Sequence, residues 1–142
     1  MNNPFTEIVR EKLAALQSYY RELAELQSIS YEDYSGNHLY RRTTERLLQL
    51  IVEAATDINN MVLKKAGEET PADYYSSFIK MAEAKVFPLE FALVIAPSTG
   101  MRNIIVHEYQ KIDNRIVYDS IKSTLEYYLK YMEYLEDYLE TH

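Results

Sequence analysis

Apolar side chains recur every three or four residues over most of this chain, which is the period of a helix that turns one face toward a core. In the first stretch these positions are Val9, Leu13, Leu16, Tyr20 and Leu23. In the last stretch they are Ile121, Leu125, Tyr128, Met132, Leu135 and Leu139. No segment shows the sustained alternation of apolar and polar residues that indicates strands. The pattern predicts an all-α protein.

Capping residues and glycines divide the first half of the pattern into helices. Asn3 and Pro4 have the types favoured at a helix N-terminus, and the first helix is expected to end near Gln27. A less regular stretch follows from Ser30. A long second helix then carries its apolar stripe as far as Gly67, which is the residue type favoured just beyond a helix C-terminus.

Prolines mark most boundaries in the second half. Pro71 is expected to open a short third helix and Pro88 a fourth, with a kink in the fourth at Pro97 or Gly100. Asp113 can cap the last helix. These elements predict an up-and-down bundle of four or five helices.

The composition supports one domain over residues 1–142, because 47% of the residues are hydrophobic and the chain has the length of a single core. There is no cysteine, which excludes disulfides and thiolate metal sites. The first residues lack the features of a signal peptide, and no uninterrupted apolar run approaches the length of a membrane span. We therefore expect a cytoplasmic protein with no membrane contact.

The net charge of −7 argues against a protein that coats nucleic acid through bulk positive charge. It leaves room for an enzyme that engages a few phosphates locally.

Chemically versatile residues are concentrated in the octapeptide 102–109. Arg102 offers a permanent charge and a planar fork that matches phosphate oxygens, and a histidine such as His107 titrates near neutral pH. Together they suffice for metal-free RNA cleavage, in which a base activates a ribose 2′-hydroxyl and the arginine stabilises charge on the phosphate. On residue types alone, however, two surface residues of an amphipathic helix are the simpler interpretation.

Helical geometry constrains this site. On a regular helix His107 lies about 140° around the axis from Arg102, whereas Tyr109 shares nearly the same face as Arg102. One straight helix cannot aim both catalytic candidates at one phosphate. The backbone is distorted near Gly100, the arginine reaches around, or a second subunit completes the site.

The spacing Arg102-x4-His107-x-Tyr109 resembles the Arg-x4-6-His signature of HEPN domains, in the form found in HepT-like ribonuclease toxins. The segment 45–59 is similar to the second-helix pattern of this family, and the segment 100–113 surrounds the motif in the same way. Between them, two further positions also match: Tyr75 and Phe78.

The resemblance implies a homodimeric HEPN-like bundle with metal-independent endoribonuclease activity, catalysed by Arg102 and His107, without a cofactor. It also implies a cognate antitoxin, an MNT-type nucleotidyltransferase that transfers AMP to Tyr109. Among RNA substrates, tRNA is the target that the family suggests.

Three polar residues are candidates for supporting roles: Asn103, Glu53 and Asp57. The two acids are one helical turn apart in a polar stripe. They could form a solvated face or bind a metal, but no Glu-x-x-His pair accompanies them. We favour support of Arg102 or His107, or a dimer contact.

The 14 tyrosines include a stripe on the last helix: Tyr127, Tyr131, Tyr134 and Tyr138. Such a stripe could stack on unpaired bases, but helix packing is the interpretation we favour. Two basic pairs, Arg41-Arg42 and Lys64-Lys65, are expected on solvated faces. The main alternative to an RNase toxin is a non-catalytic HEPN module that serves a nucleotidyltransferase partner. A purely structural bundle would leave the clustered motif unexplained.

Overall fold

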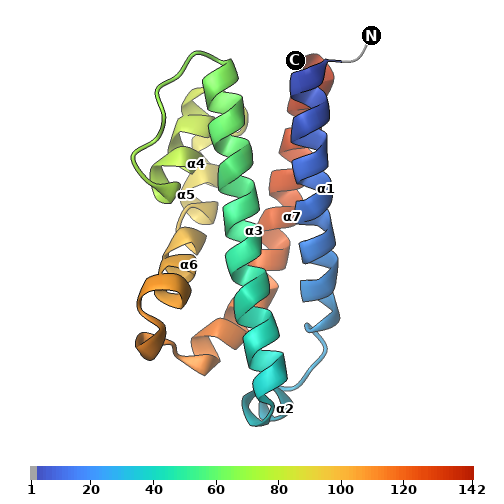
Figure 1. Ribbon diagram of the computed structural model, residues 1–142, viewed down its shortest axis with the longest axis vertical. Helices are drawn as coiled ribbons and strands as arrows, with labels where there is room; N and C mark the ends of the chain where they lie inside the picture. Colours follow the sequence, from blue (N-terminus) through green and yellow to red (C-terminus); the bar gives the residue numbers. More distant parts are fainter. Residues whose placement is uncertain (1–2) are drawn as a thin grey trace.

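Three long helices form the frame of the molecule: α1 (Pro4–Glu25), α3 (His38–Lys65) and α7 (Asn114–Thr141). In this computed structural model, which describes residues 3–142, neighbouring segments of the bundle run in alternating directions, and the start of α1 lies at the same end as the C-terminus (Figure 1). The described residues contain helices and no strand. The predicted all-α, up-and-down bundle is therefore confirmed.

Side-chain caps set most of the helix starts. The carboxamide oxygens of Asn3 and Asn37 accept bonds from the first turns of α1 and α3, and the carboxylate of Asp113 does the same for α7. The third predicted helix, α4 (Tyr74–Glu83), begins later than Pro71, because a capping box between Asp73 and Ser76 fixes its start.

The expected fourth helix is divided in two. Helix α5 (Leu89–Ile95) ends at Ala96, and α6 (Ser98–His107) begins after Pro97, so the predicted kink is a break at the proline. The stretch Leu89–His107 has a mean hydropathy of 1.3 and would be long and apolar enough to cross a membrane. In the structure this stretch is interrupted at Pro97 and packs as α5 and α6 against the rest of the bundle.

The prediction of an irregular stretch after Ser30 was wrong. A short helix, α2 (Tyr31–Gly36), forms there because the Ser30 hydroxyl accepts a bond from Asp33 N at 3.1 Å and the Tyr34 ring is fully buried. A one-turn 3₁₀ helix, η1 (Tyr109–Lys111), connects α6 to α7.

One continuous apolar core runs between the helices. Fully buried members come from α1, α3, α4, α5 and α7: Leu16, Ile51, Phe78, Ile95, Tyr128 and Leu135. The predicted packing role of the tyrosine stripe is confirmed for two of its members. Tyr131 is fully buried against Phe78 and Phe87, and Tyr134 packs on Phe87 and Phe91.

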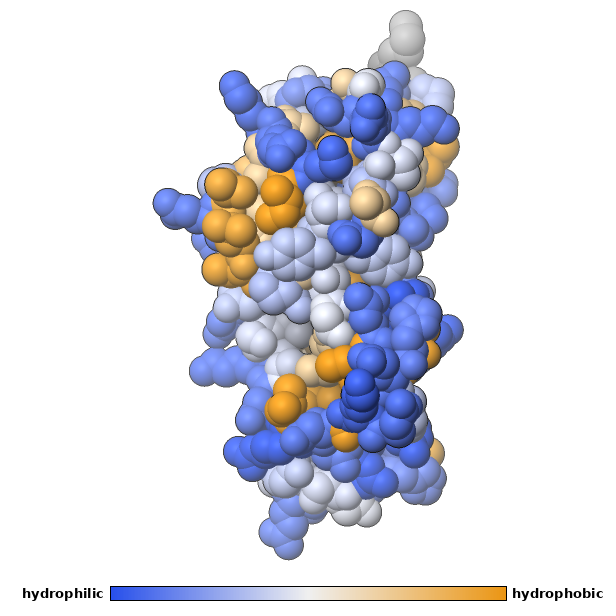
Figure 2. All heavy atoms as spheres, turned by 90° about the vertical axis from the view of Figure 1, so that its left-hand side faces the viewer, coloured by the Kyte–Doolittle hydropathy of each residue, from blue (hydrophilic) through white to orange (hydrophobic). Residues whose placement is uncertain are grey.

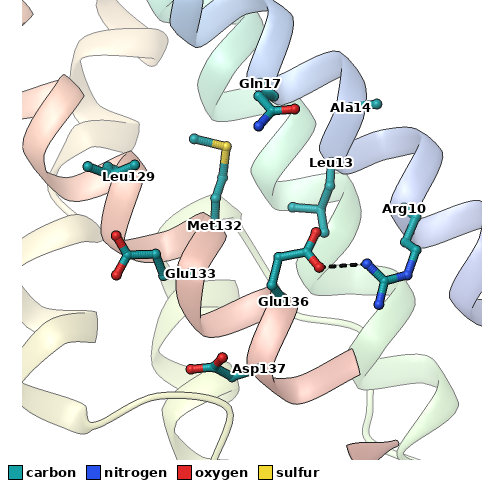
Figure 3. Close-up of a pocket in the computed structure, with 9 residues that line it drawn as sticks. All are labelled: Arg10, Leu13, Ala14, Gln17, Leu129, Met132, Glu133, Glu136 and Asp137. Atoms are coloured by element: carbon teal, nitrogen blue, oxygen red, sulfur yellow. Dashed lines mark hydrogen bonds and ion pairs between the residues drawn. The ribbon is translucent and has the colours of Figure 1, made fainter. Parts of the chain in front are cut away.

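A groove of about 460 Å³ lies between α1 and α7. Figure 3 shows its apolar floor, which includes Leu13 and Met132, and an acidic edge where Glu136 pairs with Arg10. None of the motif residues lines this groove.

A buried polar network links α3, α4 and α7 inside the core. The Tyr131 hydroxyl donates to Asn59 Oδ1 at 2.6 Å and lies 3.0 Å from the Ala55 carbonyl. Asn59 Nδ2 donates to Ser77 Oγ at 3.0 Å. Each polar side chain in this hydrogen-bond network has the next one as its partner, so removing one of them leaves a buried group unpaired.

We therefore expect Tyr131→Phe to lower the free energy of unfolding by about 1–3 kcal/mol, because Asn59 loses its donor inside the core. Tyr127→Phe is the matched control, since Tyr127 is half-buried and lies outside the network. Urea denaturation followed by circular dichroism measures both. Equal stability losses in the two variants would contradict the role assigned to the network.

Candidate active site

The octapeptide motif occupies the end of the bundle opposite the termini (Figure 1). Arg102 and His107 lie on α6, and His107 is its last residue. At Glu108 the backbone leaves the helix, with φ −136° and ψ 45°, and η1 begins at Tyr109. The motif therefore spans a helix end and the turn that follows it. The predicted distortion near Gly100 is absent from α6, which is helical from Ser98 to His107.

Arg102 is held by two neighbours from other helices. Its Nε and Nη2 donate to Glu53 Oε2 on α3 at 3.0 and 2.8 Å, and the same oxygen accepts from Gln49 Nε2 at 3.1 Å. Its guanidinium carbon lies 4.6 Å from the ring centroid of Tyr74 on α4, which is a cation–π distance. Only 15% of the side chain is exposed. The fork is thus oriented, while Nη1 faces away from Glu53 and contacts Asn103 Oδ1 at 3.3 Å.

The structure brings only some of the expected supporting residues to Arg102. Glu53 and Asn103 contact it directly. Asp57, one turn after Glu53, is exposed and lies 3.8 Å from Lys12 on α1. A helix advances about 40° around its axis over four residues, and this rotation turns Asp57 away from α6.

The His107 imidazole is exposed and makes no hydrogen bond within residues 3–142. Since Arg102 is turned toward α3, the two side chains leave α6 in different directions. The angular separation expected from helical geometry is therefore retained in this chain.

Tyr109 contacts a buried carboxylate. Its hydroxyl donates to Glu45 Oε1 on α3 at 2.8 Å, and Arg42 Nη1 lies 3.5 Å from the same oxygen. The Arg42 guanidinium also lies 5.1 Å from the Tyr109 ring centroid. Burial raises the pKa of the Tyr109 phenol, and the hydrogen bond to Glu45 raises it further by a smaller amount. The ring is nevertheless 42% exposed, so one side of it faces solvent.

The second oxygen of Glu45 is unusual. The Glu45 side chain is only 4% exposed, and its Oε2 has no hydrogen-bond partner among residues 3–142. The nearby Tyr34 hydroxyl is also buried without a partner in the described chain, and burial followed by the Glu45 charge raises the pKa of Tyr34 to about 12. A buried carboxylate oxygen without a donor is costly and suggests a chemical role.

The sequence reasoning missed Glu45, Arg42, Gln49 and Tyr74 as parts of the site. One signal was available for Glu45. It precedes Leu48, Val52 and Ala55 at three- and four-residue steps, so it occupies a position where the helical period calls for an apolar residue. A carboxylate at such a position indicates a buried polar contact.

The arrangement offers an oriented guanidinium, an exposed imidazole and a half-exposed phenol at one end of the bundle. Among residues 3–142 no three histidine, aspartate or glutamate side chains gather in an arrangement that could hold a metal ion. The groups present are those of acid–base and electrostatic chemistry.

Structures with the same fold are known. The HEPN toxin of Shewanella oneidensis, described as tri-AMPylated and in complex with an MNT antitoxin, superposes with a TM-score of 0.84 at 20% identity, covering 96% of this chain and 99% of that one. A cytosolic protein of unknown function from Bacillus subtilis superposes with a TM-score of 0.77 at 17% identity, covering 93% and 91%. These similarities establish the HEPN-like fold.

Sequence comparison is more specific. The chain is 36% identical to the tRNA nuclease HepT of Aphanizomenon flos-aquae over 141 residues, which cover 99% of this chain and 96% of that protein. The family described as Ribonuclease HepT-like matches residues 16–135, which include the whole motif and the α3 residues that contact it. The chain belongs to the HepT-like ribonuclease family.

Proposed function

We propose that this chain is the toxin of a toxin–antitoxin pair and cleaves RNA through Arg102 and His107. The observation that carries the proposal is the fixed orientation of Arg102, whose fork is clamped by Glu53 and Tyr74 on the helix that ends with the exposed His107. A purely structural arginine gains nothing from having an exposed histidine at the end of the same helix. Phosphoryl transfer requires an oriented cation and an acid–base group, and α6 supplies one of each.

In the proposed reaction His107 accepts the proton of a ribose 2′-hydroxyl. The 2′-oxygen attacks the adjacent phosphorus, and the bond from phosphorus to the 5′-oxygen breaks as that oxygen takes a proton from a water molecule. Arg102 stabilises the charge on the phosphate oxygens through Nη1, which faces away from Glu53. The products are a 2′,3′-cyclic phosphate and a 5′-hydroxyl, and no step calls for a metal ion or a cofactor.

The relative from Aphanizomenon flos-aquae is named as a tRNA nuclease, which supports tRNA as the substrate class. Arg41 and Arg42 at the start of α3 lie close enough to Tyr109 to influence its phenol and could add phosphate contacts beside the motif. The cytoplasm, where RNA and ATP occur together, is the expected compartment.

The net charge of −7 favours a second candidate, a non-catalytic HEPN module that binds a nucleotidyltransferase. The two functions separate in a cleavage assay, because a binding module leaves RNA intact whatever residues occupy positions 102 and 107.

Arg102→Ala and His107→Ala are each expected to abolish cleavage of tRNA while the helical circular dichroism spectrum stays unchanged. Wild-type cleavage should persist in EDTA and yield 2′,3′-cyclic phosphate ends, detected by mass spectrometry of the fragments. Lys64→Ala, at an exposed cationic position far from the motif, is the control and should retain activity. Loss of activity on chelation with recovery on adding a divalent ion would refute the metal-free mechanism.

We propose further that two copies of the chain form one composite cleft. Arg102 and His107 point in different directions within one chain, so a second copy is needed to place both on one phosphate. Apolar side chains are exposed on the face that α4, α5 and α6 form (Figure 2), and those of α5 are Leu89, Leu93 and Val94. An apolar surface beside the motif supports a two-fold interface there.

In mixed dimers, a chain with Arg102→Ala paired with a chain with His107→Ala is expected to recover part of the activity that each homodimer lacks. The recovery arises because the shared cleft then retains one intact Arg102 and one intact His107, each from a different chain. Differently tagged chains, co-purified and assayed on tRNA, measure it. No recovery, together with a dimer in which the motifs lie far apart, would rule out a shared cleft.

Control of the toxin is proposed to act through Tyr109. Its hydroxyl is the group to which a cognate MNT-type nucleotidyltransferase would transfer AMP, and the related Shewanella toxin is described as tri-AMPylated. The adduct would place a phosphodiester charge and a nucleotide at the mouth of the cleft. RNA phosphates would then be repelled and the path to Arg102 blocked, without unfolding.

Tyr109→Phe should therefore remain active in the presence of the nucleotidyltransferase and ATP, because it keeps the ring but offers no hydroxyl. RNA cleavage and the intact mass of the chain are the two measurements. Tyr75→Phe, an exposed tyrosine on α4, is the matched control and should be silenced like the wild type. If Tyr109→Phe is silenced fully and no adduct is found elsewhere, control is by steric binding instead.

A further inference from the structure

The contact between Tyr109 and Glu45 has the geometry of an activated nucleophile. The phenol oxygen lies 2.8 Å from Glu45 Oε1, within reach for proton transfer, and a third group, Arg42, lies 3.5 Å from that oxygen. We propose that Glu45 accepts the phenolic proton when Tyr109 receives AMP, so that this chain supplies a base for its own modification. The inference deepens the proposed control of the site and rests on it.

A base is needed because Tyr109 is a poor nucleophile as it stands. An ordinary phenol is protonated at neutral pH, and the surroundings of Tyr109 raise its pKa further. The phenol must lose its proton during the transfer rather than before it. A carboxylate already hydrogen-bonded to that proton can take it as the new bond forms.

Glu45 is suited to this task by its surroundings. It is nearly inaccessible to water, and one of its two oxygens has no donor among the described residues. Water therefore competes little with the phenolic proton for the oxygens of Glu45. Arg42 keeps it in place and, through its contact with the Tyr109 ring, keeps the nucleophile beside it.

The proposed transfer of AMP to Tyr109 breaks two bonds and forms two new ones. The O–H bond of Tyr109 breaks and its proton moves to Glu45 Oε1. The phenol oxygen forms a bond to the α-phosphorus of a nucleoside triphosphate presented by the nucleotidyltransferase. The bond from that phosphorus to the bridging oxygen breaks, and pyrophosphate leaves with the bonding electrons. The nucleotide reaches the phenol from solvent, to which Tyr109 is 42% exposed.

Glu45→Gln tests the proposal. The amide oxygen can still accept the phenolic hydrogen bond and hold the ring, but the side chain can no longer take a proton. With the full chain, its cognate nucleotidyltransferase, ATP and Mg²⁺, the initial rate of adduct formation at Tyr109 at neutral pH should fall by at least about tenfold. Intact-mass and peptide mass spectrometry measure that rate.

Glu108→Gln is the matched control, because it removes the same charge next to Tyr109 from a residue that pairs with Lys111 instead. It should be modified at the wild-type rate. The ratio of the wild-type rate to the E45Q rate should narrow as the pH rises toward the raised pKa of the Tyr109 phenol, where the phenol ionises without help. A variant that had merely misplaced the ring would be slow by the same factor at every pH.

Thermal melting shows whether E45Q folds as the wild type does. Should it not, Glu45→Asp retains a carboxylate with shorter reach, and slower modification with the wild-type pH dependence supports the proposal. Modification of E45Q at the wild-type rate overturns the role of Glu45 and leaves control through Tyr109 intact. If the wild-type chain acquires no adduct at Tyr109 under the same conditions, the proposed control itself fails.

Discussion

Two carboxylates of α3 determine where the motif can lie. Glu53 binds Arg102 and Glu45 binds Tyr109, and both pairs bridge α3 to the segment formed by α6 and η1. The two acids are separated by about 12 Å along the helix axis at 1.5 Å per residue. Because α6 runs antiparallel to α3, the residue order is reversed between the two segments (Figure 1). The later acid, Glu53, therefore meets the earlier motif residue, Arg102, and the earlier acid, Glu45, meets Tyr109.

Much of this fold could be predicted because the apolar period, the caps and the prolines act locally. Asn3, Pro97 and Asp113 each fix a boundary through bonds or clashes with their immediate neighbours. The contacts of the site depend on which helices meet and on how each helix is rotated about its axis. The apolar period of the sequence specifies neither. Glu53 and Asp57 fall in the same polar stripe, yet a rotation of about 40° gives one to Arg102 and the other to Lys12.

The acidic character of the chain bears on how RNA can bind. Arg102 and Arg42, the cations nearest the motif, are each paired with a glutamate of α3. Pairing reduces their attraction for a distant phosphate, but it fixes the direction of their remaining donors. Such a site recognises a phosphate by geometry at short range more than by long-range steering. The proposed function therefore depends on where individual cations lie, and the net charge of −7 is compatible with that function.

The proposed catalysis and its proposed control use adjacent parts of one short segment. His107 ends α6, and Tyr109 begins η1 after a single residue whose backbone leaves the helix. Because only Glu108 separates the two residues, an adduct on the phenol would act on the proposed catalytic groups by charge and bulk alone. No displacement has to travel through the packed core, whose buried network of Tyr131, Asn59 and Ser77 resists it. The modified chain is accordingly expected to stay folded while it is silent, and removal of the adduct would restore the same site.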